Sequence, residues 1–218
     1  MVELIQGLDA AVVRANLERV REEVASTGRD PSEVEILAAV KYVPEEELGV
    51  LAEGGVELLG ENRAQQLARS AEAYPGRFTW DFIGTLQSRK VRALLPYVRY
   101  IQSVASDSAL AQLARHGTPE TEVLVEVNVA GEEGKSGVAA GELSSFLERC
   151  PVRVAGLMTM PPLATDPECS RPHFAALAEL ARRHELRHLS MGTSQDYLVA
   201  VQEGATIVRL GTTLYRRS

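Results

Sequence analysis

Residues 34–41 read Val-Glu-Ile-Leu-Ala-Ala-Val-Lys, a short and nearly continuous apolar run that ends in a charged side chain. Such a run is too short and too continuous for an amphipathic helix, and it is typical of a strand that is buried on both faces. Pro44 and the acidic residues 45–47 predict the start of a helix, because proline fits the first turn and acids complement the positive end of the helix dipole. The glycines at 54 and 55 predict its end.

The same alternation of strand and helix repeats along the chain. Further strands are expected at 56–60, 78–84, 100–104, 122–129, 152–158, 186–191 and 206–210, and further helices at 62–74, 87–97, 107–117, 142–150, 171–184 and 194–204. Strands that are separated by helices imply right-handed parallel crossovers. Eight such units close into a (β/α)₈ TIM barrel, which is the predicted fold. An open doubly wound sheet is the alternative, although the first strand–helix turn lacks the G-x-G-x-x-G of its dinucleotide-binding form.

One further helix is expected at 3–27, packed on the barrel within residues 1–29. Because no composition break or long linker divides the sequence, we expect a single α/β domain over residues 1–218.

Composition narrows the class of protein. The chain of 218 residues is 45% hydrophobic and 24% charged, with a net charge of −7. These values are those of a globular protein, and the acidic balance argues against general binding to nucleic acid or to an anionic membrane. The two cysteines, Cys150 and Cys169, form no metal-binding pattern with the histidines. No signal peptide or membrane-spanning run is recognised, so a cytoplasmic location is expected.

Lys41 is the first candidate functional residue. It follows the first predicted strand, and active sites of parallel barrels lie at the C-terminal ends of the strands. An apolar surrounding would remove water from the ammonium group and favour the neutral amine, which forms a Schiff base with an aldehyde. The alternative is an ion pair with an acid such as Glu61.

Arg209 lies at the matching end of the eighth predicted strand. In a closed barrel this strand pairs with the first, so Arg209 is expected beside Lys41 despite their distance in sequence. The alternative is a structural ion pair at the rim of the barrel.

Two loops rich in glycine and hydroxyl groups follow the last two strands. Ser190, Gly192 and Ser194 belong to the first loop, and Gly211 and Thr212 to the second. Such loops, with a helix N-terminus beside them, form a cup for a phosphate group. Ser194 could also serve as an ordinary helix cap. A lysine for an aldehyde, a phosphate cup and a facing arginine together point to pyridoxal 5′-phosphate (PLP).

Six segments carry a resemblance to a known family. They are Ala-Ala-Val-Lys at 38–41, Gly-Glu-Asn at 60–62, Trp-Asp-Phe-Ile-Gly-Thr-Leu-Gln-Ser-Arg-Lys at 80–90, Gly-Leu-Met at 156–158, Leu-Ser-Met-Gly at 189–192 and Val-Arg-Leu-Gly-Thr at 208–212. Together they resemble the pyridoxal-phosphate homeostasis protein family, whose barrel is similar to the N-terminal domain of alanine racemase. The resemblance spans residues 34–213.

This resemblance implies a barrel that binds PLP and buffers or delivers it within the cell, without robust enzymatic activity. It implies an aldimine between PLP and Lys41, and Arg209 facing the pyridine nitrogen. Side chains and backbone at Gly192, Ser194, Gly211 and Thr212 would hold the phosphate, and Asn62 and Met158 would line the pocket. PLP-dependent apoenzymes are the expected recipients, and a monomer is the expected state.

Three positions depart from the family pattern. Asp81 stands where the family has histidine, Val40 where it has serine, and Arg216 where it has glycine.

Three other functions remain open. The first is a PLP-dependent amino-acid racemase or lyase. A racemase needs a second base from outside the barrel, and only residues 211–218 follow the last predicted strand. The second is a Schiff-base aldolase that acts on a sugar phosphate. The third is an interaction protein with a vestigial pocket.

Overall fold

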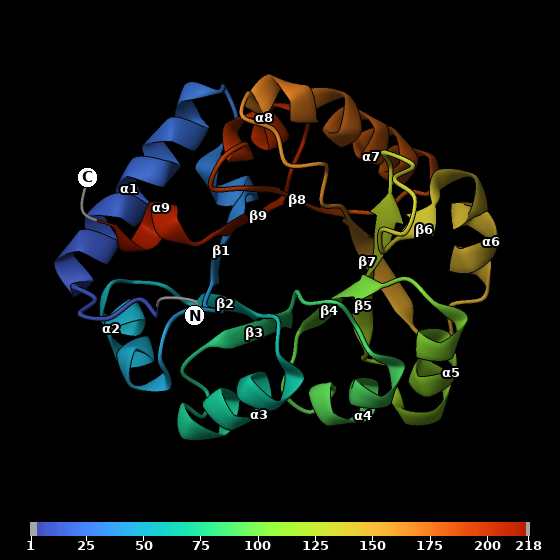
Figure 1. Cartoon of the computed structure of the whole chain (residues 1–218), viewed down its shortest axis with the longest axis horizontal. Helices are drawn as coiled ribbons and strands as arrows, with labels where there is room; N and C mark the ends of the chain where they lie inside the picture. Colours follow the sequence, from blue (N-terminus) through green and yellow to red (C-terminus); the bar gives the residue numbers. More distant parts are fainter. Residues whose placement is uncertain (1–3, 217–218) are drawn as a thin grey trace.

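Eight parallel strands form the wall of a closed barrel in the structure, a computed structural model that describes residues 4–216 (Figure 1). The strands of the wall are β1 (Glu35–Ala39), β2 (Leu58–Glu61), β3 (Thr79–Phe82), β4 (Tyr100–Val104), β5 (Glu122–Asn128), β7 (Arg153–Met158), β8 (His188–Thr193) and β9 (Ile207–Leu210). Strand β1 pairs with both β2 and β9, and β4 pairs with β5, so the sheet closes on itself. The prediction of a TIM barrel is confirmed, and the open doubly wound sheet is excluded.

Helices surround the barrel and connect its strands. They are α1 (Ala10–Ser26), α2 (Leu48–Glu53), α3 (Ala64–Ala73), α4 (Val91–Leu94), α5 (Asp107–His116), α6 (Leu143–Glu148), α7 (Arg171–Arg183), α8 (Tyr197–Gln202) and α9 (Thr212–Tyr215). Several are shorter than predicted, because their first turn is a 3₁₀ turn, as at Glu45–Glu47 before α2 and at Ser88–Lys90 before α4. The short strand β6 (Val138–Ala139), which pairs with β5, and the helix α9 were not predicted.

The N-terminal helix begins later than predicted. Residue 3, its predicted start, lies outside the described residues, and residues 4–9 are not helical. The side chain of Asp9 accepts a hydrogen bond from the amide of Ala11 and caps α1, which satisfies one of the free N–H groups of the first turn. The predicted end is confirmed, since Gly28 has a φ of 86° directly after the helix.

Apolar side chains fill two layers. The outer layer lies between the strands and the helices, and its largest fully buried side chain is Phe174 on α7. The inner cluster fills the barrel with the side chains of Leu37, Leu58, Tyr100, Leu124, Ala155, Met158 and Ile207. Neighbouring residues alternate between the layers, as period-two geometry requires. On β3, Trp80 packs in the outer layer, where its ring contacts the edge of Phe78, whereas Asp81 faces the interior.

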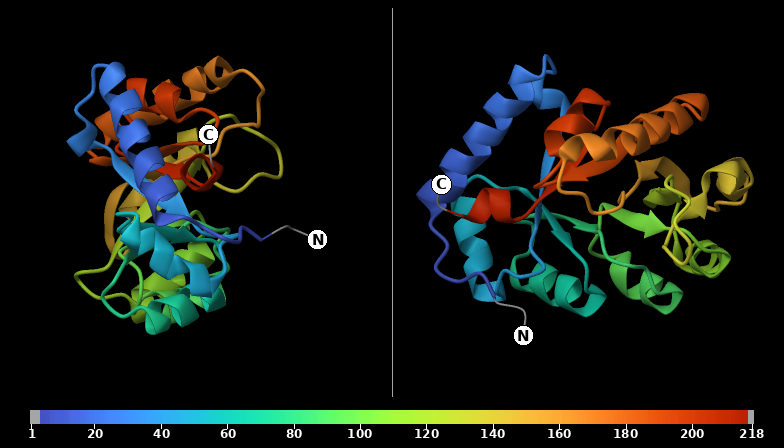
Figure 2. Two further views of the ribbon diagram at one scale, coloured as in Figure 1. Left: turned by 90° about the vertical axis from the view of Figure 1, so that its left-hand side faces the viewer. Right: turned by 45° about the horizontal axis from the view of Figure 1, so that its top comes forward.

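Helix α1 covers the last segment of the described chain. It lies beside α9 in both views of Figure 2. The buried side chain of Asn16 on α1 donates hydrogen bonds to the carbonyls of Leu214, at 3.1 Å, and Arg216, at 2.8 Å. The first helix therefore fixes the segment that follows β9.

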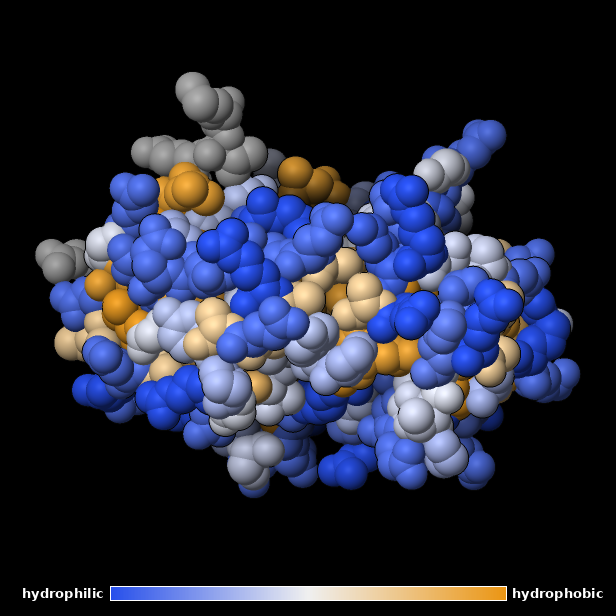
Figure 3. All heavy atoms as spheres, turned by 90° about the horizontal axis from the view of Figure 1, so that it is seen from below, coloured by the Kyte–Doolittle hydropathy of each residue, from blue (hydrophilic) through white to orange (hydrophobic). Residues whose placement is uncertain are grey.

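Hydrophilic residues cover most of the face shown in Figure 3. Among the described helices, none is long and apolar enough to cross a membrane.

Candidate functional site

Lys41 and Arg209 line the same cavity at the C-terminal end of the barrel. Lys41 follows β1, and Arg209 on β9 pairs in register with Leu37 of β1. The cavity has a volume of about 570 Å³, and each of the eight wall strands, or the loop that follows it, contributes a residue to its lining. Pockets of this size hold small organic ligands. The expected neighbourhood of these two residues is confirmed.

Lys41 is exposed at the mouth of the cavity, and its Nζ lies 4.9 Å from the centre of the Tyr42 ring. The expectation of an apolar surrounding is therefore wrong, because β1 ends at Ala39 and the next residues reach the open rim. The ion pair with Glu61 is not formed either: one oxygen of Glu61 accepts the backbone N–H groups of residues 62 and 63. Among residues 4–216, Lys41 forms no ion pair, so its amine is free for a ligand.

Arg209 is a buried cation without a carboxylate partner among the described residues, so the alternative of a rim ion pair is wrong. Its Nη1 donates to the Ser190 hydroxyl at 2.6 Å, and its Nη2 donates to the Thr159 carbonyl at 2.9 Å and contacts the Met160 sulfur at 2.8 Å. A guanidinium has five N–H donors. The remaining donors are available at the wall of the cavity.

The guanidinium of Arg209 stays positively charged although it is buried. Burial lowers the pKa of its guanidinium to about 10, against the opposing charges of Asp196 and Glu126, and this value still leaves the group protonated at neutral pH. Burial also raises the pKa of Glu126, a carboxyl group of β5 that lines the cavity, against a hydrogen bond from Ser136 and the charges of Arg209 and Lys135.

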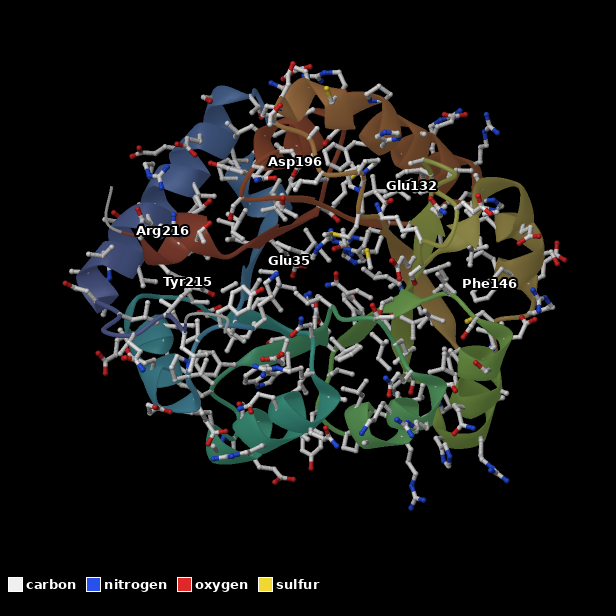
Figure 4. The ribbon with its side chains drawn as sticks, in the orientation of Figure 1. Glu35, Glu132, Phe146, Asp196, Tyr215 and Arg216 are labelled. Atoms are coloured by element: carbon white, nitrogen blue, oxygen red, sulfur yellow. The ribbon has the colours of Figure 1, made fainter. Side chains whose placement is uncertain are left out.

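The loops after β8 and β9 are joined to each other. The hydroxyl of Ser194 accepts a hydrogen bond from the amide of Gly211 at 3.2 Å. Asp196 orders the first loop, because one of its oxygens accepts from the amide of Thr193 at 2.7 Å and the other from the hydroxyl of Ser170 at 2.8 Å. Figure 4 shows Asp196 at the top of the view, on the segment before α8.

Helix α8 begins at Tyr197 rather than at the predicted Ser194, and Asp196 stands at its N-cap position. The prediction that Ser194 caps this helix is therefore wrong. Gly192 is required near the end of β8, before this loop: its φ is 90°, and a Cβ atom there would lie 2.6 Å from that of Ala200.

Seven of the nine predicted site residues line the cavity, namely Lys41, Asn62, Met158, Ser194, Arg209, Gly211 and Thr212. Ser190 and Gly192 do not line it. Ser190 is fully buried, and its hydroxyl accepts a hydrogen bond from Arg209. Gly192 packs against α8.

Sequence reasoning missed other residues of the cavity wall. Glu126 stands among apolar residues of β5, and Ser103 stands beside Gln102 on β4; such polar residues within a buried strand could have marked these positions as candidates. Tyr215 lies on the unpredicted α9, and its hydroxyl donates to the carbonyl of Ala39, which fixes α9 to the end of β1. No group of acids, histidines and cysteines able to hold a metal occurs among the residues that the structure describes.

The three departures from the family pattern have separate surroundings. Val40 is buried in the outer layer, and Arg216 is exposed. Asp81 is fully buried and accepts hydrogen bonds from Arg99 and Gln102. Only Asp81 contacts the polar interior of the barrel.

Comparison with solved structures shows that the fold of this protein is a barrel like that of alanine racemase. Alanine racemase from Corynebacterium glutamicum matches with a TM-score of 0.73 and 17% identity, over 97% of this chain and 62% of that chain. PipY from Synechococcus elongatus, solved with PLP bound, matches with a TM-score of 0.77 and 27% identity, over 94% of this chain and all of that chain (100%).

Sequence relatives identify the family. The pyridoxal phosphate homeostasis protein of Aquifex aeolicus is 39% identical over 215 residues, which cover 91% of this chain and 93% of the relative. That of Pseudomonas aeruginosa is 35% identical over 207 residues, with 90% of each chain covered. No family model matches the chain. The chain belongs to the pyridoxal phosphate homeostasis protein family, as its motifs predicted.

Proposed function

We propose that this protein binds PLP in the cavity between Lys41 and Arg209, holds it reversibly, and buffers or delivers it within the cell. The amine of Lys41 attacks the aldehyde carbon, a C=N bond forms, and the aldehyde oxygen leaves as water. An incoming amine reverses this bond by exchange and releases the cofactor. The PLP bound to the related PipY and the names of the sequence relatives support this proposal.

The observation that carries the proposal is the buried Arg209, a cation without a carboxylate partner among the described residues, on the wall that also carries the free amine of Lys41. These two groups fit the two reactive ends of PLP. Its aldehyde requires an amine, which Lys41 has, and its ring nitrogen accepts a hydrogen bond, which Arg209 can donate. The joined loops at Ser194 and Gly211 fit its phosphate.

Arg209 also explains why binding need not lead to turnover. PLP supplies an electron sink when its ring nitrogen is protonated, usually beside a carboxylate. A guanidinium with a pKa of about 10 donates a hydrogen bond to that nitrogen but does not take up its proton. The ring nitrogen stays unprotonated, and the sink is weakened. We therefore propose that decarboxylation and transamination are not the role of this chain.

The decisive experiment uses the small number of lysines. The sequence contains three, Lys41, Lys90 and Lys135. We expect the protein mixed with PLP to show a visible imine absorbance, and borohydride reduction followed by mass spectrometry to label Lys41. Lys41→Ala should abolish both signals.

Lys90→Ala and Lys135→Ala are matched controls. Lys90 lines a neighbouring cavity of about 400 Å³ and not the one that Lys41 lines, and Lys135 forms an ion pair with Glu132. Both variants should keep the absorbance. A band that survives Lys41→Ala, or equal affinity for pyridoxal and PLP, would contradict the proposal.

One observation favours amino-acid chemistry as a second candidate function. Glu126 on β5 lines the cavity across the barrel from Lys41 on β1, so the two groups approach a ligand from different sides. Exchange of the α-proton of an added amino acid in deuterated water, lost in Glu126→Gln, would support a racemase or lyase. Its absence in the PLP-bound protein supports the carrier. An aldolase would need a sugar phosphate before borohydride trapped any adduct.

A further inference from the structure

A chain of hydrogen bonds crosses the interior of the barrel beneath the cavity. Nη1 of Arg209 on β9 donates to the hydroxyl of Ser190 on β8 at 2.6 Å, and this hydroxyl donates to Oε1 of Gln102 on β4 at 2.6 Å. Nε2 of Gln102 donates to the carboxylate of Asp81 on β3 at 2.7 Å. These four residues are at most 6% exposed. The chain links two opposite walls of the barrel through otherwise apolar space.

The donor and the acceptor in each hydrogen bond are fixed by the groups at the two ends of the chain, Arg209 and Asp81. A guanidinium is a donor only, and a carboxylate is an acceptor only. The amide nitrogen of Gln102 must therefore face Asp81, its oxygen must face Ser190, and the Ser190 proton must point away from Arg209. The three bonds run in one direction, from the cation to the anion.

Burial raises the pKa of Asp81, and the hydrogen bonds from Arg99 and Gln102 and the charge of Arg99 oppose that shift. The hydrogen-bond geometry around Asp81 is that of a carboxylate. Its two oxygens accept from Nε of Arg99 at 3.1 Å, from Nη2 of Arg99 at 2.8 Å, from the amide of Tyr100 at 3.2 Å and from Gln102. All four partners are donors, so the carboxyl group needs no proton of its own. Arg99 also pairs with Glu35 at 2.6 Å, which anchors the end of the chain at the N-terminal side of the barrel.

We propose that Gln102 and Asp81 are positioning residues that act through Ser190 to fix the orientation and the effective charge of Arg209 toward the ring nitrogen of bound PLP. The inference rests on the proposed function. Arg209 has no carboxylate in direct contact among the described residues, and the charges of Asp196 before α8 and Glu126 on β5 raise its pKa against the effect of burial. The oriented chain supplies a remote counter-charge without giving the ring nitrogen an acid that could protonate it.

The chain has a measurable consequence for bound PLP. A positive charge close to the ring disfavours the protonated form of the bond to Lys41, and the remote carboxylate offsets part of that charge. Removing the counter-charge should therefore lower the pKa of this bond. Breaking the relay at Gln102 should do the same, because Ser190 then loses the acceptor that orients its proton.

The experiment is a pH titration of the visible absorbance of the PLP-bound protein. We expect the midpoint to fall by roughly half a unit to one unit in Asp81→Asn and Gln102→Met. Ser70→Ala is the control, since Ser70 is a buried hydrogen-bonded side chain on α3, remote from the relay. It should titrate like the wild type.

The outcomes separate the two proposals. If Asp81→Asn fails to fold because Arg99 loses one of its two carboxylate partners, Gln102→Met still tests the relay with the Arg99–Asp81 ion pair intact. Wild-type midpoints in folded variants that bind PLP would overturn the inference and leave the proposed function standing, because a structural role changes stability and not the titration. A wild-type protein without absorbance or label at Lys41 would overturn the proposed function first.

Discussion

The outer layer and the interior of the barrel are built on different principles, although the same strands form both. The outer layer joins strands to helices through close-packed apolar side chains such as Leu67 and Phe174. The interior has a small apolar cluster, with charged and hydrogen-bonded groups of Asp81, Gln102 and Arg209 beside it. Stability is therefore expected to depend mainly on the outer layer, and ligand chemistry mainly on the interior.

This difference shows which residues of a buried strand indicate a functional site. Strands that are covered on both faces appear nearly uniform in hydrophobicity. A polar residue within such a strand is costly to bury unless it is hydrogen-bonded, so each one marks a position that faces the interior. In this protein Ser103, Glu126 and Arg209 line the cavity, and Asp81, Gln102 and Ser190 lie beneath it.

The largest expected effect is on the outer layer. Phe174→Ala removes a side chain that is 0% exposed, and such truncations cost about 3–5 kcal/mol of unfolding free energy. Urea unfolding should show this loss. The pH midpoint of the bound-PLP absorbance should stay unchanged, and a shifted midpoint would show that the two regions are not separate.

The interior should respond in the opposite way. Arg209→Met removes a buried cation together with its desolvation cost, so the PLP-free protein should change in stability by less than about 2 kcal/mol. PLP affinity should fall by roughly tenfold to a hundredfold, because a hydrogen bond from a charged group is lost. Absorbance titration measures this affinity.

Arg153→Met is the matched control for that prediction, since Arg153 is an exposed arginine that pairs with Glu122 outside the cavity. It should bind PLP like the wild type. A large loss of stability in Arg209→Met would mean that this residue serves the fold rather than the ligand.

The smallest effect is a pH dependence at His188 on β8. Burial lowers the pKa of this imidazole below its usual value of 6.5, and its Nδ1 is buried without a hydrogen-bond partner. The unfolded chain then binds a proton that the folded chain does not. The free energy of unfolding should be largest above about pH 6.5 and should decrease as the pH falls below that value. His188→Gln should flatten this part of the curve in thermal unfolding from about pH 8 to about pH 5.

The fold was predictable because its signals are local and repeated. The strand at 100–104 was predicted at its exact bounds, and the others lie within two residues at most ends. Chain closure followed from the number of units, since eight strand–helix units place the last strand against the first.

The rest depended on contacts that no local pattern contains. Helix α9 is only Thr212–Tyr215, and it is held by Asn16 from the other end of the chain. Strand β8 runs to Thr193, with a register shift against β9 between Ser190 and Thr193, and α8 begins only at Tyr197. Such a bulge re-aims the end of a strand. The hydrogen-bond partners of Asp81 could not be predicted either, because they lie on or just before the neighbouring strand β4 and not in the motif that contains Asp81.

Trp80 offers a practical consequence of the alternation on β3. It is the single tryptophan of the chain, and it is packed in the outer layer directly before Asp81. Its ultraviolet emission overlaps the absorbance of an imine of PLP, so occupancy of the barrel should quench its fluorescence by energy transfer. The protein thus contains its own optical probe, and cofactor release to an acceptor can be timed without attaching a dye.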